Sequence, residues 1–144
     1  MPNLSASLED YLEAIHNLAL EATVARSKDI AELLGVSRSS VTGALRALKK
    51  KGLVNYQPYG FVTLTKKGQA AAAEVVYRHE ALKSFMMDVL GIDPPTAQSA
   101  ACKAEHSLGP RVISRLLDFI EFATKENKDG YDVIGRFRDF CNEK

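Results

Sequence analysis

Residues 29–54, DIAELLGVSRSSVTGALRALKKKGLV, constrain the fold more than any other part of the chain. Apolar residues recur at three- and four-residue steps on both sides of Gly35, which is typical of two short amphipathic helices. Gly35 is placed to end the first of them in the left-handed conformation. The segment therefore predicts two helices joined by a tight turn.

Serines precede both helices and are expected to cap them. Ser27 stands before the first helix, SKDIAELLG, and Ser37 before the second, which is expected to run to about Lys51. The second helix turns three residues inward: Val41, Leu45 and Leu48. Gly52 follows it and is expected to stop it.

A β-hairpin is predicted directly after this helix pair, in residues 53–65, LVNYQPYGFVTLT. Both ends of the segment are rich in apolar, aromatic and β-branched residues, and Pro58-Tyr59-Gly60 supplies a turn between them. Two helices across a tight turn, followed by a hairpin, predict a winged helix-turn-helix.

The rest of the chain is predicted to be helical, so the expected fold class is mainly α. The expected helices span Ser7–Leu20 (capped by Ser7), Lys66–Leu90 (ended by Gly91), Pro94 to a point before Gly109, Arg111–Lys125 and Tyr131–Cys141. We expect a DNA-binding domain over residues 1–65 and an all-helical metal-binding and dimerisation domain over residues 66–144.

Charge is distributed unevenly along the chain. Nine basic and two acidic residues lie between Arg26 and Lys67, against ten basic and sixteen acidic residues elsewhere. A basic segment in an otherwise acidic chain favours a polyanionic partner for that segment. Because it coincides with the predicted winged helix-turn-helix, the partner we expect is double-stranded operator DNA.

In such a fold the second helix of the pair enters the major groove. Its outward residues are small or hydrogen-bonding near the start and cationic near the end. We therefore expect the start of the helix to contact base edges and the lysines at its end to hold phosphates. The residues we expect to contact DNA are Arg26, Lys28, Ser37, Arg38, Ser39, Ser40, Thr42, Arg46, Lys49 and Lys50.

Composition excludes several classes of protein. No apolar run is long enough to cross a membrane, and the first residues lack the pattern of a secretory signal. The two cysteines, Cys102 and Cys141, do not suggest a disulfide framework. We therefore expect a cytoplasmic protein with neither a membrane partner nor a protein substrate.

Potential metal ligands are grouped in ACKAEH, residues 101–106. Cys102, Glu105 and His106 stand at i, i+3 and i+4, so one helix face would present all three. Asp10, Glu13 and His79 widen the set. These residues also have ordinary structural explanations. Asp10 and Glu13 could interact with the helix dipole, His79 could be a surface residue, and Cys102 could be a small core residue.

The chain resembles the diphtheria toxin repressor and manganese transport regulator family of metal-dependent transcriptional repressors. The resemblance runs from about Leu8 to Phe122 and rests on LEDYLEAIH, residues 29–54, VTLTKKG, VYRHE and CKAEH. It implies a winged helix followed by a helical dimerisation domain. It also implies that the homodimer grips its operator when divalent metal is bound. Because the chain ends at Lys144, we expect the two-domain form, without the SH3-like third domain of many iron-branch members. The family's ligand positions fall on Asp10, Glu13, His79, Cys102, Glu105 and His106.

The resemblance mixes two branches of this family. Asp10 and Glu13 match the manganese branch, whereas Cys102 matches the iron branch, and Lys83 and Gln98 depart from the ancillary site of the latter. Oxygen ligands suit manganese, and thiolate with imidazole suits iron(II), cobalt, nickel or zinc. We expect Mn²⁺ or Fe²⁺, with Co²⁺, Ni²⁺ and Zn²⁺ possible in vitro.

The expected main site comprises Asp10, Cys102, Glu105 and His106. A weaker second site would comprise Glu13, His79 and a shared carboxylate.

Two other functions are compatible with parts of the sequence. A metal-independent winged-helix regulator could sense a small molecule or an oxidant, with Cys102 or Cys141 as the sensor thiol. A metallohydrolase would leave the basic helix and wing without a role. We therefore expect a transcriptional regulator that controls metal homeostasis, and not an enzyme.

Overall fold

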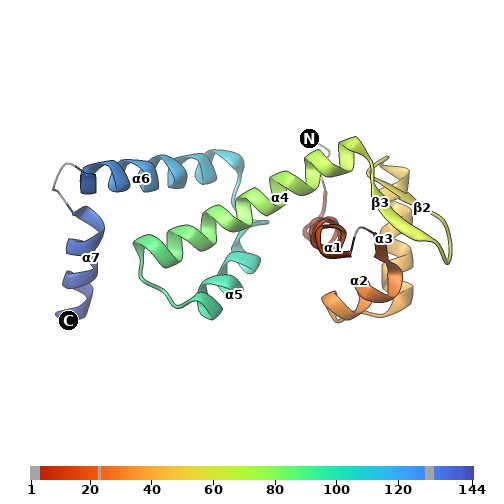
Figure 1. The fold of residues 1–144 in the computed structure, drawn as a ribbon, viewed down its shortest axis with the longest axis horizontal. Helices are drawn as coiled ribbons and strands as arrows, with labels where there is room; N and C mark the ends of the chain where they lie inside the picture. Colours follow the sequence, from red (N-terminus) through yellow and green to blue (C-terminus); the bar gives the residue numbers. More distant parts are fainter. Residues whose placement is uncertain (1–3, 23, 129–131) are drawn as a thin grey trace. The chain divides into compact units, whose positions relative to one another are not determined.

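The fold is given by a computed structural model that describes residues 4–22, 24–128 and 132–144 (Figure 1). The described residues are mainly helical, with one small antiparallel sheet. The chain divides into two compact units, Met1–Val76 and Tyr77–Lys144. Helix α4 (Lys66–Ser84) belongs to both. The domain boundary predicted between residues 65 and 66 falls at the start of α4 and stays a prediction.

The first unit contains the predicted helix pair and hairpin. Its elements are α1 (Ala6–Ala22), β1 (Ala25–Arg26), α2 (Ser27–Leu34), α3 (Arg38–Lys50), β2 (Val54–Tyr56), β3 (Phe61–Leu64) and the first part of α4. Gly35 follows α2 with φ 64°, in the left-handed conformation that the sequence predicted.

One apolar core holds the first unit together. Its large fully buried side chains come from the helices and strands of the unit: Leu12, Ile15, Ile30, Val41, Leu45, Leu48, Leu53 and Val62. Burying each such side chain contributes about 1.5–3 kcal/mol. Val41, Leu45 and Leu48, which the sequence predicted to face inward from the second helix of the pair, are among these side chains, so that prediction is confirmed.

The sheet has one more strand than the sequence predicted. Strand order is β1-β3-β2, and all neighbours are antiparallel. In β1, Ala25 pairs with Val62 and Arg26 with Phe61. Because β1 has only two residues, it has no alternation of polar and apolar side chains by which the sequence could reveal it.

Two of the predicted serine caps are wrong. Helix α1 begins at Ala6, and the hydroxyl of Ser5, rather than Ser7, accepts a bond from the N–H of Leu8 at 3.4 Å. Ser27 is the first residue of α2, so the N-cap residue is Arg26, whose extended backbone belongs to β1 and which makes no side-chain cap bond.

The cap predicted at Ser37 is confirmed. Its hydroxyl accepts a bond from the N–H of Ser40 at 3.2 Å, which satisfies one of the free donors in the first turn of α3.

The start of α4 is tied closely to the end of α3. The hydroxyl of Thr65 accepts from the N–H of Gly68 and donates to the carbonyl of Gly52, at 3.0 and 2.7 Å. A Cβ on Gly68 would lie 1.8 Å from the carbonyl oxygen of Leu53. Only glycine allows this approach, which fixes where α4 leaves the hairpin.

The second unit is built from helices. After α4 come η1 (Phe85–Val89), α5 (Pro94–Ala104), α6 (Pro110–Lys128) and α7 (Val133–Asn142). Its core contains Ala81, Leu82, Ala101 and Ile113. The predicted start of the last helix, Tyr131, lies outside the described residues, and Asp132 caps α7 by accepting from the N–H of Gly135.

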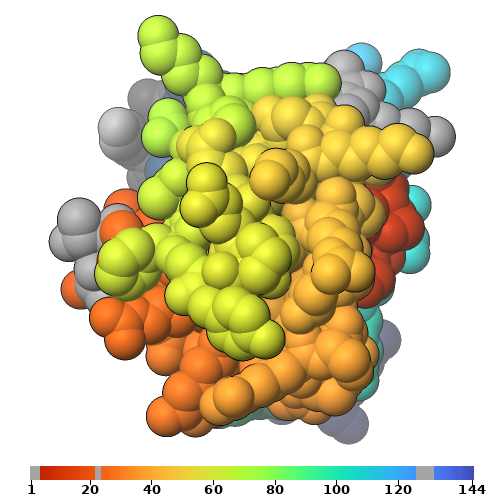
Figure 2. Space-filling view, turned by 90° about the vertical axis from the view of Figure 1, so that its right-hand side faces the viewer, coloured from red at the N-terminus to blue at the C-terminus, as the bar shows by residue number. Residues whose placement is uncertain are grey.

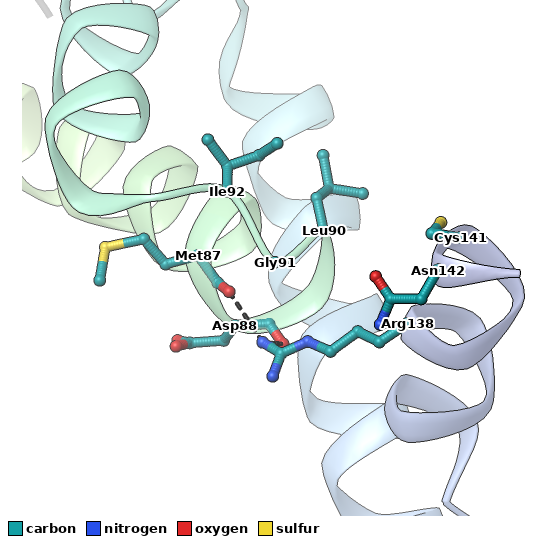
Figure 3. A pocket seen from close by; sticks show the side chains of 8 residues that line it. All are labelled: Met87, Asp88, Leu90, Gly91, Ile92, Arg138, Cys141 and Asn142. Atoms are coloured by element: carbon teal, nitrogen blue, oxygen red, sulfur yellow. Dashed lines mark hydrogen bonds between the residues drawn. The ribbon is translucent and has the colours of Figure 1, made fainter. Parts of the chain in front are cut away.

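The segment predicted as the end of one long α-helix is instead the π-helix η1. Its last turn is closed from α7: the guanidinium of Arg138 donates to the carbonyls of Met87 and Asp88, at 2.8 and 2.7 Å (Figure 3). Gly91 then adopts φ 71°. A π turn leaves no periodic signal in a five-residue segment, so the sequence could not distinguish it from an α turn.

No helix among the described residues combines the length and the hydropathy needed to cross a bilayer.

Candidate metal centre and nucleic-acid interface

Helix α3 lies beside the hairpin on the face seen in Figure 2, and its exposed side chains are polar or cationic. Of the residues predicted to contact DNA, only Thr42 is partly buried, and the others are exposed. All ten lie in the first unit, on β1, α2, α3 and the turn before α3. The structure therefore gathers them in one compact unit, and their contact with DNA stays a prediction.

Several of these polar groups already have partners within the chain. The hydroxyl of Ser37 lies 2.9 Å from those of Ser39 and Ser40. The hydroxyl of Thr42 donates to the carbonyl of Arg38 at 3.0 Å. The first turn of α3 is thus a connected set of hydroxyls, which orients them before any ligand arrives.

The lysines at the end of α3 are not equivalent. The ammonium of Lys49 donates to the carbonyl of Tyr56 at 2.8 Å, so Lys49 links α3 to β2. Lys50, the next residue, is exposed at the end of α3. Lys67, on α4, donates to the carbonyl of Lys51 at 3.3 Å. The sequence could not separate these roles because the three lysines at 49–51 are adjacent.

A groove of about 280 Å³ lies between α3 and the turn of the hairpin. It is lined by basic and polar residues of α2 and α3 and by aromatic residues and proline of the hairpin: Ser27, Lys28, Arg38, Thr42, Arg46, Tyr56, Pro58 and Tyr59. The described residues that line this groove include no acidic side chain, so its charge suits a phosphate strand.

In the second unit, a buried carboxylate joins two imidazoles. Glu105 is 1% exposed, and its Oε2 lies 2.6 Å from Nδ1 of His79, which is itself 2% exposed. The other oxygen, Oε1, lies 3.2 Å from Nε2 of His106. Two histidines and one glutamate that the sequence predicted as ligands therefore meet in one place, although they come from α4 and from the end of α5.

The thiol of Cys102 belongs to the same cluster. Its Sγ lies 3.9 Å from Nδ1 of His79. On its other side, the side-chain amide of Gln98 donates to Sγ, also at 3.9 Å. Gln98 was singled out in the sequence only as a departure from the iron branch. Its position one turn before Cys102 on α5 is the signal that predicts this contact.

The prediction that one helix carries all three of Cys102, Glu105 and His106 is wrong. Helix α5 ends at Ala104, Glu105 is its C-cap residue, and His106 lies in the turn that follows. The N–H groups of Ser107 and Leu108 both bond to the carbonyl of Ala104. The chain must leave the helix here because Gly109 and Pro110 follow, and Pro110 begins α6.

Asp10 and Glu13 lie in the first unit. They stand at i and i+3 on α1, both partly exposed, so their carboxylates share one face of that helix. The pKa of the Tyr11 hydroxyl is raised, mainly by burial of the group and secondly by the negative charge of Asp10. The structure thus brings His79, Cys102, Glu105 and His106 together in one unit and Asp10 with Glu13 in the other.

The cluster in the second unit fits a divalent transition metal by its chemistry. It offers one thiol, one carboxylate and two imidazoles, which are ligands for iron(II), cobalt, nickel and zinc, and the carboxylate also suits manganese. A carboxylate buried at 1% exposure needs a positive or donating partner. Imidazoles on both sides meet that need and leave the donor set preorganised.

Cys141, the other cysteine, is far along the chain from this cluster and lies on α7. It is exposed and lines a pocket of about 330 Å³ together with Met87, Asp88, Leu90, Gly91, Ile92, Arg138 and Asn142 (Figure 3). The pocket holds one carboxylate and one guanidinium, and this guanidinium already bonds two backbone carbonyls. Among the residues that the structure describes, no group of three metal ligands includes Cys141.

Two family models match the chain in succession. The iron-dependent repressor N-terminal DNA-binding domain matches residues 3–62, and the iron-dependent repressor metal-binding and dimerisation domain matches residues 65–130. Together they cover the helix-turn-helix, the hairpin and the cluster around Glu105.

Curated relatives agree with this match. An uncharacterised helix-turn-helix-type transcriptional regulator of Methanocaldococcus jannaschii is 39% identical over 119 residues, which is 82% of this chain and 95% of the relative. The helix-turn-helix-type transcriptional regulator MntR of Bacillus subtilis is 36% identical over 127 residues, covering 88% of this chain and 89% of the relative.

Solved structures show the same fold. A manganese-dependent transcriptional repressor in complex with manganese superposes with a TM-score of 0.73 at 33% identity, over 80% of this chain and 53% of the other. The manganese regulator SloR superposes with a TM-score of 0.70 at 29% identity, over 80% and 54%. This chain thus spans about half the length of those two proteins.

The DNA-binding unit, the metal-ligand cluster and these matches identify one family. The chain belongs to the iron-dependent repressor family of metal-dependent transcriptional repressors, which combine a DNA-binding domain with a metal-binding and dimerisation domain.

Proposed function

We propose that this protein binds a two-fold operator as a homodimer when it is loaded with a divalent transition metal, and so controls metal homeostasis. The observation that carries the proposal is the buried carboxylate of Glu105, held between the imidazoles of His79 and His106. The family's metal dependence and the basic face of α3 supply the rest of the argument.

The proposed metal ligands are those expected from the sequence. Cys102, Glu105 and His106, with Asp10, would form the main site. Glu13 and His79 would form a weaker one, with Glu105 as the carboxylate shared between them. Support for sharing comes from the two oxygens of Glu105, one directed to each imidazole. When bound, the ion supplies positive charge and a fixed coordination number.

Mn²⁺ and Fe²⁺ are the metals we propose for the cell. The structural relative with the higher TM-score of the two described above is a manganese-dependent repressor that holds manganese. The thiol of Cys102 favours iron(II) over manganese, whereas Asp10, Glu13 and Glu105 provide the oxygen ligands that manganese prefers.

Operator recognition is assigned to α3. Arg38, Ser39, Ser40, Thr42 and Arg46 are proposed to reach base edges in the major groove. Arg26, Lys28, Ser37, Lys49 and Lys50 are proposed to hold phosphates, which sets position without reading sequence. We place this activity in the cytoplasm, where the thiols of Cys102 and Cys141 stay reduced.

The dimer is proposed to form through the last two helices. Large apolar side chains are exposed there on two adjoining helices: Val112, Phe119 and Phe122 on α6, and Phe137 and Phe140 on α7. Exposed apolar surface of this extent marks an interaction site. A two-fold dimer would present two α3 helices at a set spacing, which is what a two-fold operator requires.

The proposal is tested by fluorescence anisotropy on a duplex selected from random DNA. Binding is measured at one fixed salt concentration with chelator and then with manganese, iron(II), cobalt, nickel and zinc, because phosphate contacts make affinity steeply salt-dependent. We expect chelator to abolish binding and at least one metal to restore it. Equal binding in chelator would contradict metal control and would make Cys102 or Cys141 the residue to test as an oxidant sensor.

A further inference from the structure

The thiol of Cys102 has nitrogen atoms from two different helices within reach. Nε2 of Gln98, one turn earlier on α5, lies 3.9 Å from Sγ. Nδ1 of His79, on α4, also lies 3.9 Å from Sγ. The sulfur atom is therefore contacted both from its own helix and from the helix that carries the buried histidine.

The hydrogen-bonding roles at this sulfur follow from the chemistry of its partners. A side-chain amide NH2 group donates and cannot accept, so Gln98 donates to Sγ of Cys102. Nδ1 of His79 lies 2.6 Å from Oε2 of Glu105, so its one hydrogen-bonding position is already engaged with the carboxylate. The sulfur is thus an acceptor toward Gln98, which is the role that a metal-binding thiolate has toward its neighbours.

Helix α5 holds Gln98 and Cys102 in a fixed relation to each other. Asp93 caps the first turn of this helix, and Ala97 and Ala101, the residues just before the pair, are fully buried. Residues four apart on a helix are neighbours on one face. Because the adjacent face of α5 is anchored in the core, the amide of Gln98 reaches the sulfur from a rigid element.

The fold has little need of this contact. Gln98 and Cys102 are both exposed. Water competes for hydrogen bonds between exposed groups, and a glutamine that holds one position loses rotamer freedom. The contact lies, however, beside a proposed metal ligand. A group that hydrogen-bonds to a metal ligand orients that ligand and changes its electron density, so the contact can matter for the metal.

We propose that Gln98 is a positioning residue that sets the metal preference of the site through the thiol of Cys102. Its amide holds the sulfur within reach of His79, and this favours ions that take thiolate ligands, namely iron(II), cobalt and zinc, over manganese. Gln98 acts as a donor to the ligand and is not itself a ligand. This inference rests on the proposed function and adds to it a residue that selects among metals.

Calorimetric titration of the full-length protein with Co²⁺ and with Mn²⁺ tests the proposal. Gln98→Leu removes the donor and keeps a side chain of similar size. Co²⁺ is expected to bind roughly tenfold more weakly, a loss typical of a missing outer partner, and Mn²⁺ within about twofold of wild type. Gln69→Leu, at an exposed glutamine in the first turn of α4, is the matched control and should bind both ions as wild type. Unchanged Co²⁺ affinity in Gln98→Leu, or equal losses for the two ions, overturns the proposal.

A double-mutant cycle shows whether Gln98 acts through the thiol. Once Cys102→Ala has removed the sulfur, adding Gln98→Leu is expected to change Co²⁺ affinity by less than about twofold. A loss as large as the one in wild type contradicts the inference, because Gln98 would then act without the thiol, for example as a ligand.

Absorption spectroscopy gives a readout that a merely structural role would not move, because thiolate bound to Co²⁺ produces a charge-transfer band in the near ultraviolet. At saturating Co²⁺ we expect this band in wild type, its absence in Cys102→Ala, and a weaker or shifted band in Gln98→Leu. An unchanged band in Gln98→Leu overturns the proposal, also where Cys102→Ala binds too little metal to be titrated. Metal-free Gln98→Leu is expected to melt as wild type does, and a lower melting temperature would assign Gln98 to the fold instead.

The failure of this inference can be distinguished from that of the proposed function. If wild type binds Co²⁺ without a thiolate band, Cys102 is not a ligand and the inference fails. The proposed function then stands, provided that chelator still abolishes operator binding. If wild type binds neither ion, both fail together.

Discussion

Oε2 of Glu105 lies 2.6 Å from Nδ1 of His79, and both side chains are almost completely buried. His106 approaches the other oxygen of Glu105 at 3.2 Å. This carboxylate therefore organises the ligand cluster before any ion is present. Its replacement is the sharpest change that can be made to the proposed metal centre.

Glu105→Gln keeps the size of the side chain but removes its charge and replaces one of its two accepting oxygens by a donating amide nitrogen. We expect metal affinity to fall at least about tenfold, because a neutral amide is a poorer ligand and a poorer partner for two imidazoles. Calorimetric titration with Co²⁺ measures the effect, and circular dichroism checks that the fold is kept. Glu143→Gln, on the surface at the end of α7, serves as the matched control and should bind as wild type.

Cys102→Glu replaces the thiol by the carboxylate of the manganese branch. The order of activating metals is expected to shift toward manganese, since manganese prefers oxygen ligands. Operator binding across the metal series measures the shift, with Cys141→Ser as the control for loss of a thiol. An unchanged order of metals would mean that Cys102 is not a ligand.

The two serines predicted as caps provide a test of the fold. Ser37→Ala removes the acceptor for the N–H of Ser40 and should lower the free energy of unfolding by about 1 kcal/mol. Ser27→Ala should cost little, because Ser27 is inside α2 and is not its N-cap residue. Urea unfolding of both variants measures the difference. Equal losses would contradict the assignment of the caps.

The sequence predicted the helices and the hairpin of the first unit because their signals are periodic. Ile30, Val41, Leu45 and Leu48 repeat at helical steps, and they are all buried. The wrong cap at Ser7 arises because Ser5 and Ser7 are both candidates before the same helix, and the wrong cap at Ser27 arises because α2 begins at Ser27 itself, after Arg26. In α1 the cap is Ser5, two residues earlier.

For the ligand cluster, residue type was predictable but local geometry was not. The spacing of Cys102, Glu105 and His106 favoured one helix face, yet α5 ends at Ala104 and His106 lies in a turn. Contacts between α4 and the end of α5 depend on how helices pack, which spacing in one segment does not encode. In the hairpin, Pro58-Tyr59-Gly60 predicts a turn but not its conformation, in which Tyr59 has φ 61°.

Two neighbouring lysines should respond differently to removal. Lys50→Ala is expected to weaken DNA binding and to reduce the slope of log affinity against log salt by about 0.9, the value for one lost phosphate contact. Stability should not change. Lys49→Ala should also destabilise the protein, because Lys49 bonds the carbonyl of Tyr56. Salt-dependent anisotropy and urea unfolding of both variants separate the two effects. The reverse pattern would contradict the role assigned to Lys49.

Acid should weaken the cap of α5. The N–H and the side chain of Thr96 bond to Asp93 and hold the pKa of its carboxyl below its usual value. A lowered folded-state pKa stabilises the protein above the unfolded-state pKa, near 3.8, and this contribution is lost as the pH falls through the folded-state value. Urea midpoints of wild type and Asp93→Asn should therefore differ more at pH 5 than at pH 3. A difference that is constant with pH would contradict this account.

The central claim is that metal and operator binding are coupled, and coupling must act in both directions. The most direct measurement is metal affinity, determined by titration with and without saturating operator duplex at the same salt concentration. The account predicts that operator tightens metal binding by the same factor by which metal tightens operator binding. Identical metal affinity in the two titrations would contradict it and would separate the cluster around Glu105 from the control of DNA binding.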